Sequence, residues 1–519
     1  MERGTRAMTT KEHNQILMKR VSELEQENRK LHETVTYLTG KLFGSKSEKT
    51  SALQIDGQMS LFDEVETTTE PEQQEPAIEE VTGTTKRRYQ GQRREMFKNV
   101  PHEKKLCTIP EEERTCDTCG TILSPVGEEF VRSEIEYTPA KIKVVDYYRE
   151  TFECRNCRKN EQPYMKKPEV PCAVIQHSYA SASTVSWLIH QKYELAVPLY
   201  RQEQEWASMG VPLKRSIMSN WIMAVYRDWL APVEELLHRK LLEENCLHAD
   251  ETPVQVLNEP GRKNTTQSYM WLYRTGKQSS KPVILFEYQP GRSGKYPESF
   301  LKGFQGYLHT DAYSGYGKVM SVKRCYCWTH LRRKFVEALP KDLKNSEETL
   351  SAQGIQYINK LFEIESRLEG LSSEERKEQR LLQEKPVLDA FWSWIDTETV
   401  NTLPKSKIGE AFRYAANQKE GLMTYLEDGD CALSNNLAEN SIRPFTIGRK
   451  NWLFSGSPKG AKASAGVYSL IETAKANGLK PRKYIQFILS NLPGTAFREH
   501  PELLEEFLPW SQNVQEKCH

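Results

Sequence analysis

Three acidic side chains, each in a distinctive local context, are the residues of this chain best suited to chemistry. Asp250 lies in HADETPVQVL, Asp311 in YLHTDAYSGYG and Glu439 in SNNLAENSIRP. Two strand carboxylates that converge with one helix carboxylate form an oxygen cage of the kind that Mg²⁺ or Mn²⁺ prefers. Two such ions roughly 4 Å apart activate a hydroxyl and stabilise a leaving oxygen in phosphodiester chemistry. The pattern therefore predicts a metal-dependent enzyme that cuts and joins DNA.

The two aspartates fall in segments with the composition of β-strands. Runs rich in Val, Leu, Ile and Tyr, separated by turn residues, cover 246–257, 268–274, 283–288 and 306–310. With a helix predicted over 294–302, this order of elements matches a ribonuclease-H-like core. Because successive side chains of a strand point to opposite faces, only one of Asp250 and Glu251 can join Asp311. We select Asp250 from its context and expect Glu251 to face away from the cage.

The third acid lies in a segment of helical composition. We expect Asn435 and Asn436 to cap this helix and Pro444 to end it. Glu439 then shares a helix face with Arg443, which brings a carboxylate next to a guanidinium suited to phosphate. A single helical Glu is ordinarily a solvated surface residue, but the polar and basic neighbours here favour function. The cations expected to face DNA near the cage are Arg332, Arg333, Arg443, Arg449 and Lys450.

The segment between the second and third acids has two parts. Cys327 and His330 lie in CWTHLRRKF and supply only two candidate ligands, so we expect them to pack beneath the acids rather than to bind a metal as a pair. Residues 341–428 are charged, poor in strand formers and strongly helical in composition. This stretch is predicted to be a helical insertion in the catalytic core.

Two CxxC pairs account for four of the eleven cysteines. Cys116 and Cys119 form the first pair, Cys154 and Cys157 the second, and a β-rich segment separates them. Zn²⁺ takes four soft ligands in a tetrahedron, and each tight CxxC loop offers two thiolates. Unpaired surface thiols are the alternative. The spacing favours a structural Zn²⁺ ribbon.

Residues 200–209 and 216–226 have helical composition and flank a short turn that begins at Gly210. The second helix of such a pair can enter a DNA major groove, led here by Lys214 and Arg215. Helix-turn-helix geometry is equally common in plain helical packing, so both interpretations stay open.

A heptad repeat occupies residues 15–42. Its seam positions are Leu17, Val21, Leu24, Asn28, Leu31, Val35, Leu38 and Leu42. A lone seam asparagine fixes the register and favours a parallel pair, so we expect a homodimer or higher oligomer through this coiled coil. The alternative is a monomeric amphipathic helix packed on the rest of the protein.

The charge and composition of the chain limit how it could contact nucleic acids or membranes. The net charge of +1 over 519 residues means that any contact with nucleic acid arises from local basic patches. An acidic linker over 61–80 is followed by a basic run over 86–94. The basic run is either a solvated tail or a segment that binds phosphates. The apolar runs are too short to cross a bilayer and the N-terminus lacks a signal-peptide core, which predicts a soluble cytoplasmic protein without a membrane partner.

With these motifs in view, the chain resembles the transposases of bacterial insertion-sequence family 66. The matching segments are KLFGSKSEK, the two CxxC pairs, LHADETPVQVL, HTDAYSGYG, CWTHLRRKF, SNNLAENSIRP and GRKNWLFSGS. The resemblance implies an Asp-Asp-Glu enzyme in which Asp250, Asp311 and Glu439 are catalytic. It also implies recognition of terminal inverted repeats, attack on target DNA and cooperation with small accessory proteins of the same element.

The combined prediction is a multidomain α+β protein with a coiled coil, a zinc ribbon, a helix-turn-helix region and a ribonuclease-H-like α/β core with a helical insertion. Its expected parts are the coiled coil 1–50, the linker 51–100, the zinc-binding domain 101–170, the helical region 171–240, the first part of the core 241–338, the insertion 339–430, the completion of the core 431–490 and the tail 491–519. The rival functions are a nuclease of the same fold that cuts without joining, and a zinc-containing dimeric DNA-binding regulator without catalysis.

Overall fold

The computed structural model of the protein describes residues 18–21, 142–147, 152–153, 165–166, 170–340 and 349–519. The chain divides into two compact units, one of residues 51–146 and one of the remaining residues, here called the core unit. Nearly all of the described residues belong to the core unit. Of the predicted coiled coil only residues 18–21 are described, and these are helical. Pairing of two chains through this segment stays a prediction.

A mixed six-stranded sheet organises the core unit. Its strands follow the order β5-β4-β3-β6-β7, with β8 joined to β3. β5, β4 and β3 are antiparallel, whereas β6, β7 and β8 are each parallel to the strand they join. All four predicted strands are present, each within one residue of its expected ends. The strands are β3 (Cys246–Val256), β4 (Gln267–Thr275), β5 (Ile284–Gln289), β6 (Gly306–Thr310), β7 (Val322–Tyr326) and β8 (Phe454–Ser455).

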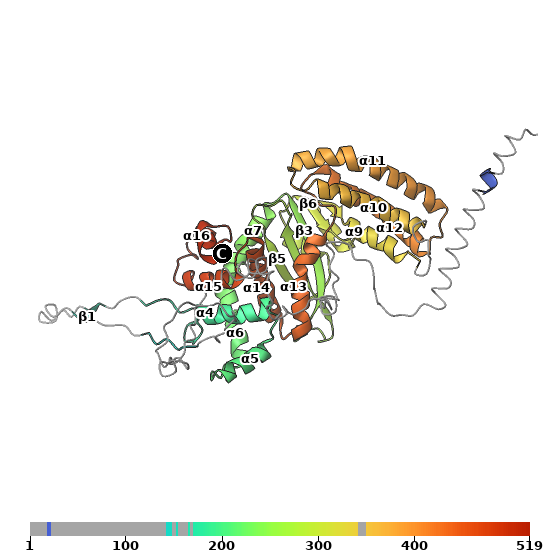
Figure 1. Cartoon of the computed structure of the whole chain (residues 1–519). Helices are drawn as coiled ribbons and strands as arrows, with labels where there is room; N and C mark the ends of the chain where they lie inside the picture. The colour runs from blue at the N-terminus through green and yellow to red at the C-terminus, as the bar shows by residue number, and fades with distance from the viewer. Residues whose placement is uncertain (1–17, 22–141, 148–151, 154–164, 167–169, 341–348) are drawn as a thin grey trace, which may run out of the picture. The chain divides into compact units, whose positions relative to one another are not determined.

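One edge of β3 is only partly paired with other strands. β6 pairs with its first three residues and β8 with residues near its C-terminal end. Within the described sheet, residues 249–254 therefore have no strand neighbour on that edge. Helix α13 (Asn436–Trp452) packs against β3, as Figure 1 shows. The Asn435 side chain donates a hydrogen bond of 2.9 Å to the Ala249 carbonyl, which replaces a bond that a strand would make.

The helix α13 corrects two predictions. Pro444 does not end it, because the helix continues through this residue to Trp452. Proline removes one backbone hydrogen bond, but buried Ile442 and Phe445 on either side pack into the main hydrophobic core and hold both halves in place. The predicted side-chain cap is also absent, since Asn435 occupies the N-cap position but uses its amide to bind β3.

Helices cover the sheet and shield its β5 edge. The Ser469 hydroxyl accepts from the Phe286 N–H at 2.8 Å, and the Thr473 hydroxyl accepts from the Ile284 N–H at 2.9 Å. These contacts from α14 satisfy edge groups that could otherwise pair with another strand. The helices are α4 (Ala182–Ile189), α5 (Leu199–Ser208), α6 (Arg215–Val225), α7 (Ala231–Leu242), α8 (Lys295–Phe300), α14 (Pro458–Ala476), α15 (Pro481–Asn491) and α16 (Gln512–Cys518).

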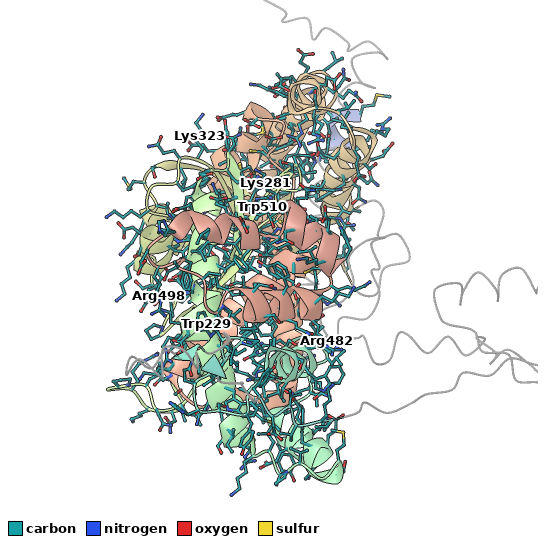
Figure 2. All side chains as sticks on the ribbon, turned by 90° about the vertical axis from the view of Figure 1, so that its left-hand side faces the viewer. Trp229, Lys281, Lys323, Arg482, Arg498 and Trp510 are labelled. Carbon is teal, nitrogen blue, oxygen red and sulfur yellow. The ribbon has the colours of Figure 1, made fainter. Side chains whose placement is uncertain are left out.

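The C-terminal segment packs back onto the sheet region. The Lys281 ammonium, in the loop between β4 and β5, lies 5.8 Å from the ring centroid of Trp510, and Figure 2 shows the two side chains together. The last helices are therefore part of the core unit and close over the strand connections.

A helical bundle with a hydrophobic core of its own occupies the region of the predicted insertion (Figure 1). Helices α10 (Leu350–Arg367), α11 (Ser373–Val400) and α12 (Lys407–Met423) lie within the predicted bounds 339–430. Helix α9 (Trp328–Glu337), which was assigned to the first part of the core, packs with them. The buried rings of Phe335, Phe391 and Phe412 pack together at the centre of the bundle. Because α9 follows β7 after a single residue, the bundle is joined directly to the sheet that carries the acids.

Both helices of the predicted helix-turn-helix are present as α5 and α6. Gly210 begins the turn with a φ of +83°, a left-handed conformation that favours glycine. Two short strands, β1 (Phe152–Glu153) and β2 (Met165–Lys166), pair antiparallel. The four predicted zinc ligands themselves lie outside the described residues. None of the described helices has the length and apolar character needed to cross a membrane.

Candidate active site

Asp250 and Asp311 stand at the same level of two neighbouring parallel strands. The last register pair of β3 and β6 is His248 with His309. Each aspartate comes two residues after its histidine, so continuing the register places Asp250 level with Asp311. Asp250 lies on the unpaired stretch of β3, and Asp311 follows the end of β6 directly. The sheet thus leaves both carboxylates at an edge that no strand occupies within the described fold.

Glu439 reaches the same edge because its helix is docked on β3. Asn435, which is 2% exposed, accepts from the His248 imidazole at 2.9 Å while its amide donates to Ala249. Its backbone N–H also donates to the Cys327 Sγ at 3.1 Å. Glu439 follows one helical turn after this anchor, so its position relative to Asp250 depends on Asn435.

Asp250 interacts electrostatically with the other acids, and this affects its pKa. Burial raises this pKa well above its ordinary value, and the negative charges of Glu251 and Glu439 raise it further. The charge of Asp311 adds a smaller effect in the same direction. Carboxylates that repel one another in a half-buried site gain stability when a divalent cation neutralises them.

The donor set fits such a cation. Among the described residues, the Oε1 atom of Glu439 and the Oδ1 atom of Asn436 are buried without a hydrogen-bond partner. Both atoms are side-chain oxygens on α13, and hard divalent cations prefer oxygen ligands. Ligation by a metal ion would satisfy atoms that the protein itself leaves unpaired.

Glu251 is linked to the site through an arginine. It lies on the face of β3 opposite Asp250, as strand alternation predicts, where it accepts hydrogen bonds from Tyr316 and from Arg292 at 2.6 Å. The Arg292 guanidinium also lies 3.7 Å from Asp311. Burial raises the pKa of Glu251, and the charge of Asp311 contributes to the rise. Glu251 thus faces away from Asp250, but Arg292 connects it to Asp311.

Cys327 and His330 lie beside Glu439. Their ligand atoms and a carboxylate oxygen of Glu439 are all within 4.8 Å of one another. The His330 Nε2 atom is 3.8 Å from Glu439. Burial lowers the pKa of His330, but the hydrogen bond with Cys327 and the charge of Glu439 raise it above its ordinary value overall. In this arrangement the pair holds the start of α13 and the carboxylate of Glu439.

The cations predicted to face DNA differ in how exposed they are. Arg332 is 9% exposed and donates to Asn359 of α10 at 2.8 Å, so the structure argues against its predicted DNA contact. Arg449 is half-buried and donates to Thr252 of β3, where it holds the far end of α13. Arg443 is half-buried, and the exposed members of the set are Lys214, Arg215, Arg333 and Lys450.

Reasoning from the sequence missed two residues of this site. Arg292 stands in the QPGRSGKY turn after β5, and Asn435 was assigned to a helix cap. A lone arginine between two glycines is a weak signal of function. Asn435 was easier to suspect of another role, because the adjacent asparagine was available to cap the helix.

Family models match most of this chain. A model described as "Transposase IS66 family" matches residues 177–463, the "zinc-finger binding domain of transposase IS66" matches 113–158, the "IS66 C-terminal element" 469–510 and the "Transposase C of IS166 homeodomain" 30–104. The zinc-finger match includes all four cysteines of the predicted ribbon.

Similar proteins occur in Sinorhizobium fredii (strain NBRC 101917 / NGR234). The uncharacterized protein y4hP is 28% identical over 91% of this chain and 87% of its own length. The uncharacterized protein y4qI is 28% identical over 90% of this chain and 86% of its own, and y4jD is 28% identical over 78% and 79%. No solved structure matches the chain.

Proposed function

The chain belongs to the IS66 family of DNA transposases, and on that premise we propose that Asp250, Asp311 and Glu439 form its catalytic metal site. The observation that carries the proposal is the edge of β3 left open between β6 and β8, where the register brings the two aspartates level and α13 delivers the glutamate. When bound, two Mg²⁺ or Mn²⁺ ions would supply activation of the attacking hydroxyl and stabilisation of the leaving oxygen.

The chain's own residues have distinct roles in this proposal. The three carboxylates hold the metal ions, and Asn435 holds Glu439 in place through β3. Arg292 restrains Asp311 and neutralises Glu251. Arg333 and Lys450 are the cations placed to contact phosphates near the acids, and Lys214 and Arg215 those placed at the leading end of α6.

We infer a ribonuclease-H-like fold for the core. The support is the strand order, with three antiparallel strands followed by two parallel ones, Asp250 on the first strand and Asp311 directly after the fourth. The helical insertion stands between the second and third acids, as the sequence predicted. We propose that the chain has the domains predicted from its sequence.

An assay with DNA carrying the element's terminal inverted repeats tests the function. Incubation with Mg²⁺ and a target plasmid is expected to yield nicks at the repeat ends and covalent joining of those ends to the plasmid. Cleavage without any joined product would assign the protein to the nuclease alternative. Binding without cleavage under all metal conditions would assign it to the regulator alternative.

We further propose that the coiled coil over 15–42 pairs two chains and so brings two element ends together. Small proteins of the same element are proposed accessory partners, and the bacterial cytoplasm, at the nucleoid, is the proposed location. Light scattering of the protein with and without residues 1–50 tests the pairing, since the truncated chain is expected to be a monomer with a folded core.

Removal of a ribbon cysteine is expected to remove one metal ion. Cys154→Ser takes one of four tetrahedral thiolates from the proposed Zn²⁺ ribbon, and ribbon folding depends on the metal. Metal analysis should show one Zn²⁺ per chain fewer than in the unmodified protein, with faster proteolysis around residues 101–170. Cys172→Ser, an exposed cysteine outside the quartet, is the matched control. An unchanged zinc content in Cys154→Ser would contradict the ribbon.

Glu251→Gln is expected to increase the metal requirement of the enzyme. Without the Glu251 charge, Arg292 is freed to pair more closely with Asp311 and to compete with Mg²⁺ there. The half-maximal Mg²⁺ concentration for cleavage should rise about fivefold, equivalent to about 1 kcal/mol for a partly exposed ion pair. The rate at saturating Mg²⁺ should be largely retained.

The double variant Glu251→Gln/Arg292→Gln is the control for this competition. Its Mg²⁺ requirement should return toward that of the unmodified enzyme, because the competing guanidinium is gone. A complete loss of cleavage in Glu251→Gln even at saturating Mg²⁺ would show instead that Glu251 is a metal ligand and that Asp250 was chosen wrongly.

A further inference from the structure

A second group of potential metal ligands lies in the interior of the core unit, apart from the three acids. Cys246, His309 and Cys431 are all buried, and their ligand atoms lie within 4.8 Å of one another. A fourth residue, Cys325, is fully buried with its Sγ 3.6 Å from that of Cys431. Of the six free cysteines in the described chain, Cys246 and Cys431 thus group with His309, and Cys325 adjoins Cys431.

The sheet register explains why these residues meet. His309 of β6 is the direct neighbour of Cys325 of β7, so the two side chains stand on the same face of the sheet. Cys246 of β3 pairs with Tyr307, which precedes His309 by two residues and therefore shares that face. Cys431 reaches this face from the loop before α13. Four segments that are distant in sequence each contribute one ligand.

The separation between the sulfur atoms of Cys325 and Cys431 suits two ligands of one tetrahedral metal ion better than a disulfide. A disulfide needs sulfur atoms about 2.05 Å apart, well below the 3.6 Å between Cys325 and Cys431. Two thiolates bound to Zn²⁺ at about 2.3 Å in a tetrahedron are about 3.8 Å apart. The observed separation is close to this tetrahedral value.

A buried histidine lies among these cysteines. The Nε2 atom of His309 accepts from the Ala432 N–H at 3.1 Å, and its Nδ1 atom is buried without a partner among the described residues. A neutral imidazole offers one lone pair, so ligation of a metal ion through Nε2 would replace the hydrogen bond from the Ala432 N–H.

We propose that Cys246, Cys325, Cys431 and His309 bind a structural Zn²⁺ ion. Three thiolates and one imidazole are a common ligand set of structural zinc sites, whose closed coordination leaves no position for substrate. The ion would join the start of β3, β6 and β7 to the loop that leads into α13. Cys431 is four residues before Asn435, so the site would hold the segment that docks Glu439 beside Asp250.

Metal analysis of the full-length protein tests this site independently of transposition. We expect two tightly bound Zn²⁺ ions per chain, one in the predicted ribbon and one in the core. The variant Cys116→Ser/Cys119→Ser, in which the ribbon is disabled and the core ligands are intact, should keep one. Cys431→Ser should lose one, and the buried but distant Cys518→Ser should keep both.

Cobalt gives a second readout that does not depend on the core variant folding. In the ribbon-disabled variant, replacement of zinc by Co²⁺ should produce the thiolate-to-metal charge transfer and strong visible bands of tetrahedral thiolate coordination. A folded ribbon-disabled protein that holds neither zinc nor cobalt would overturn the proposal. A Cys325–Cys431 disulfide found in the protein purified under reducing conditions would also overturn it.

Discussion

Asp250→Asn, Asp311→Asn and Glu439→Gln are each expected to abolish DNA cleavage and strand transfer by the transposase. Each change removes one negative charge from the proposed metal cage at nearly constant volume. Metal ions contribute several kcal/mol to the stabilisation of the transition state, so activity should fall by at least about 1000-fold, or about 4 kcal/mol. The protein should remain folded, because burial and mutual repulsion already make the charge of Asp250 costly.

The measurement combines cleavage with binding. Inverted-repeat DNA is incubated with each variant, with Mg²⁺ for products and without metal for affinity. Metal-free binding should persist or strengthen, since a charge that repels phosphate has been removed. Glu298→Gln, an exposed glutamate of α8, is the matched control and should cleave normally. Transposition by all three cage variants would disprove the Asp-Asp-Glu assignment.

Asn435→Ala is expected to cause the largest loss of stability among single changes near the site. The substitution leaves the Ala249 carbonyl and the His248 imidazole buried without their partner. Each such group costs about 1–3 kcal/mol, so the core should lose about 3 kcal/mol of unfolding free energy. Cleavage should also fall, because Glu439 is held through this residue.

Denaturant unfolding monitored by tryptophan fluorescence measures the first effect, and cleavage below the unfolding range measures the second. Asn451→Ala provides the control, because Asn451 is exposed on the last turn of the same helix. Equal unfolding midpoints for the two variants would show that docking of α13 does not depend on Asn435.

The strands were predictable from the sequence because their signals are local. Runs rich in Val, Leu, Ile and Tyr with intervening turns placed β3 to β6 within one residue, since such residues are favoured in strands. The family of the chain was recognisable from its motifs, and the family models confirm it. The helical insertion was evident from its composition.

Features that depend on tertiary contacts were mispredicted. Pro444 ends many helices, but here buried neighbours on both sides keep α13 continuous. Asn435 has a high propensity for helix caps, yet an unpaired carbonyl on β3 binds its amide. Arg332 was expected to face DNA because of its charge, but the α9–α10 contact buries it. In each case a partner distant in sequence outweighed a local preference.

The sequence alone determined which residues could do chemistry, since residue type and local context specify a carboxylate, a thiol or a strand. Only the tertiary structure decided which of them meet. Strand alternation separated Asp250 from Glu251, but it could not show that Arg292 links Glu251 back to Asp311. The register of β3, β6 and β7 likewise put Cys246, His309 and Cys325 on one face, next to Cys431 from a loop, although their spacing in sequence suggests no site. Such convergence depends on long-range strand pairing, which local sequence patterns do not encode.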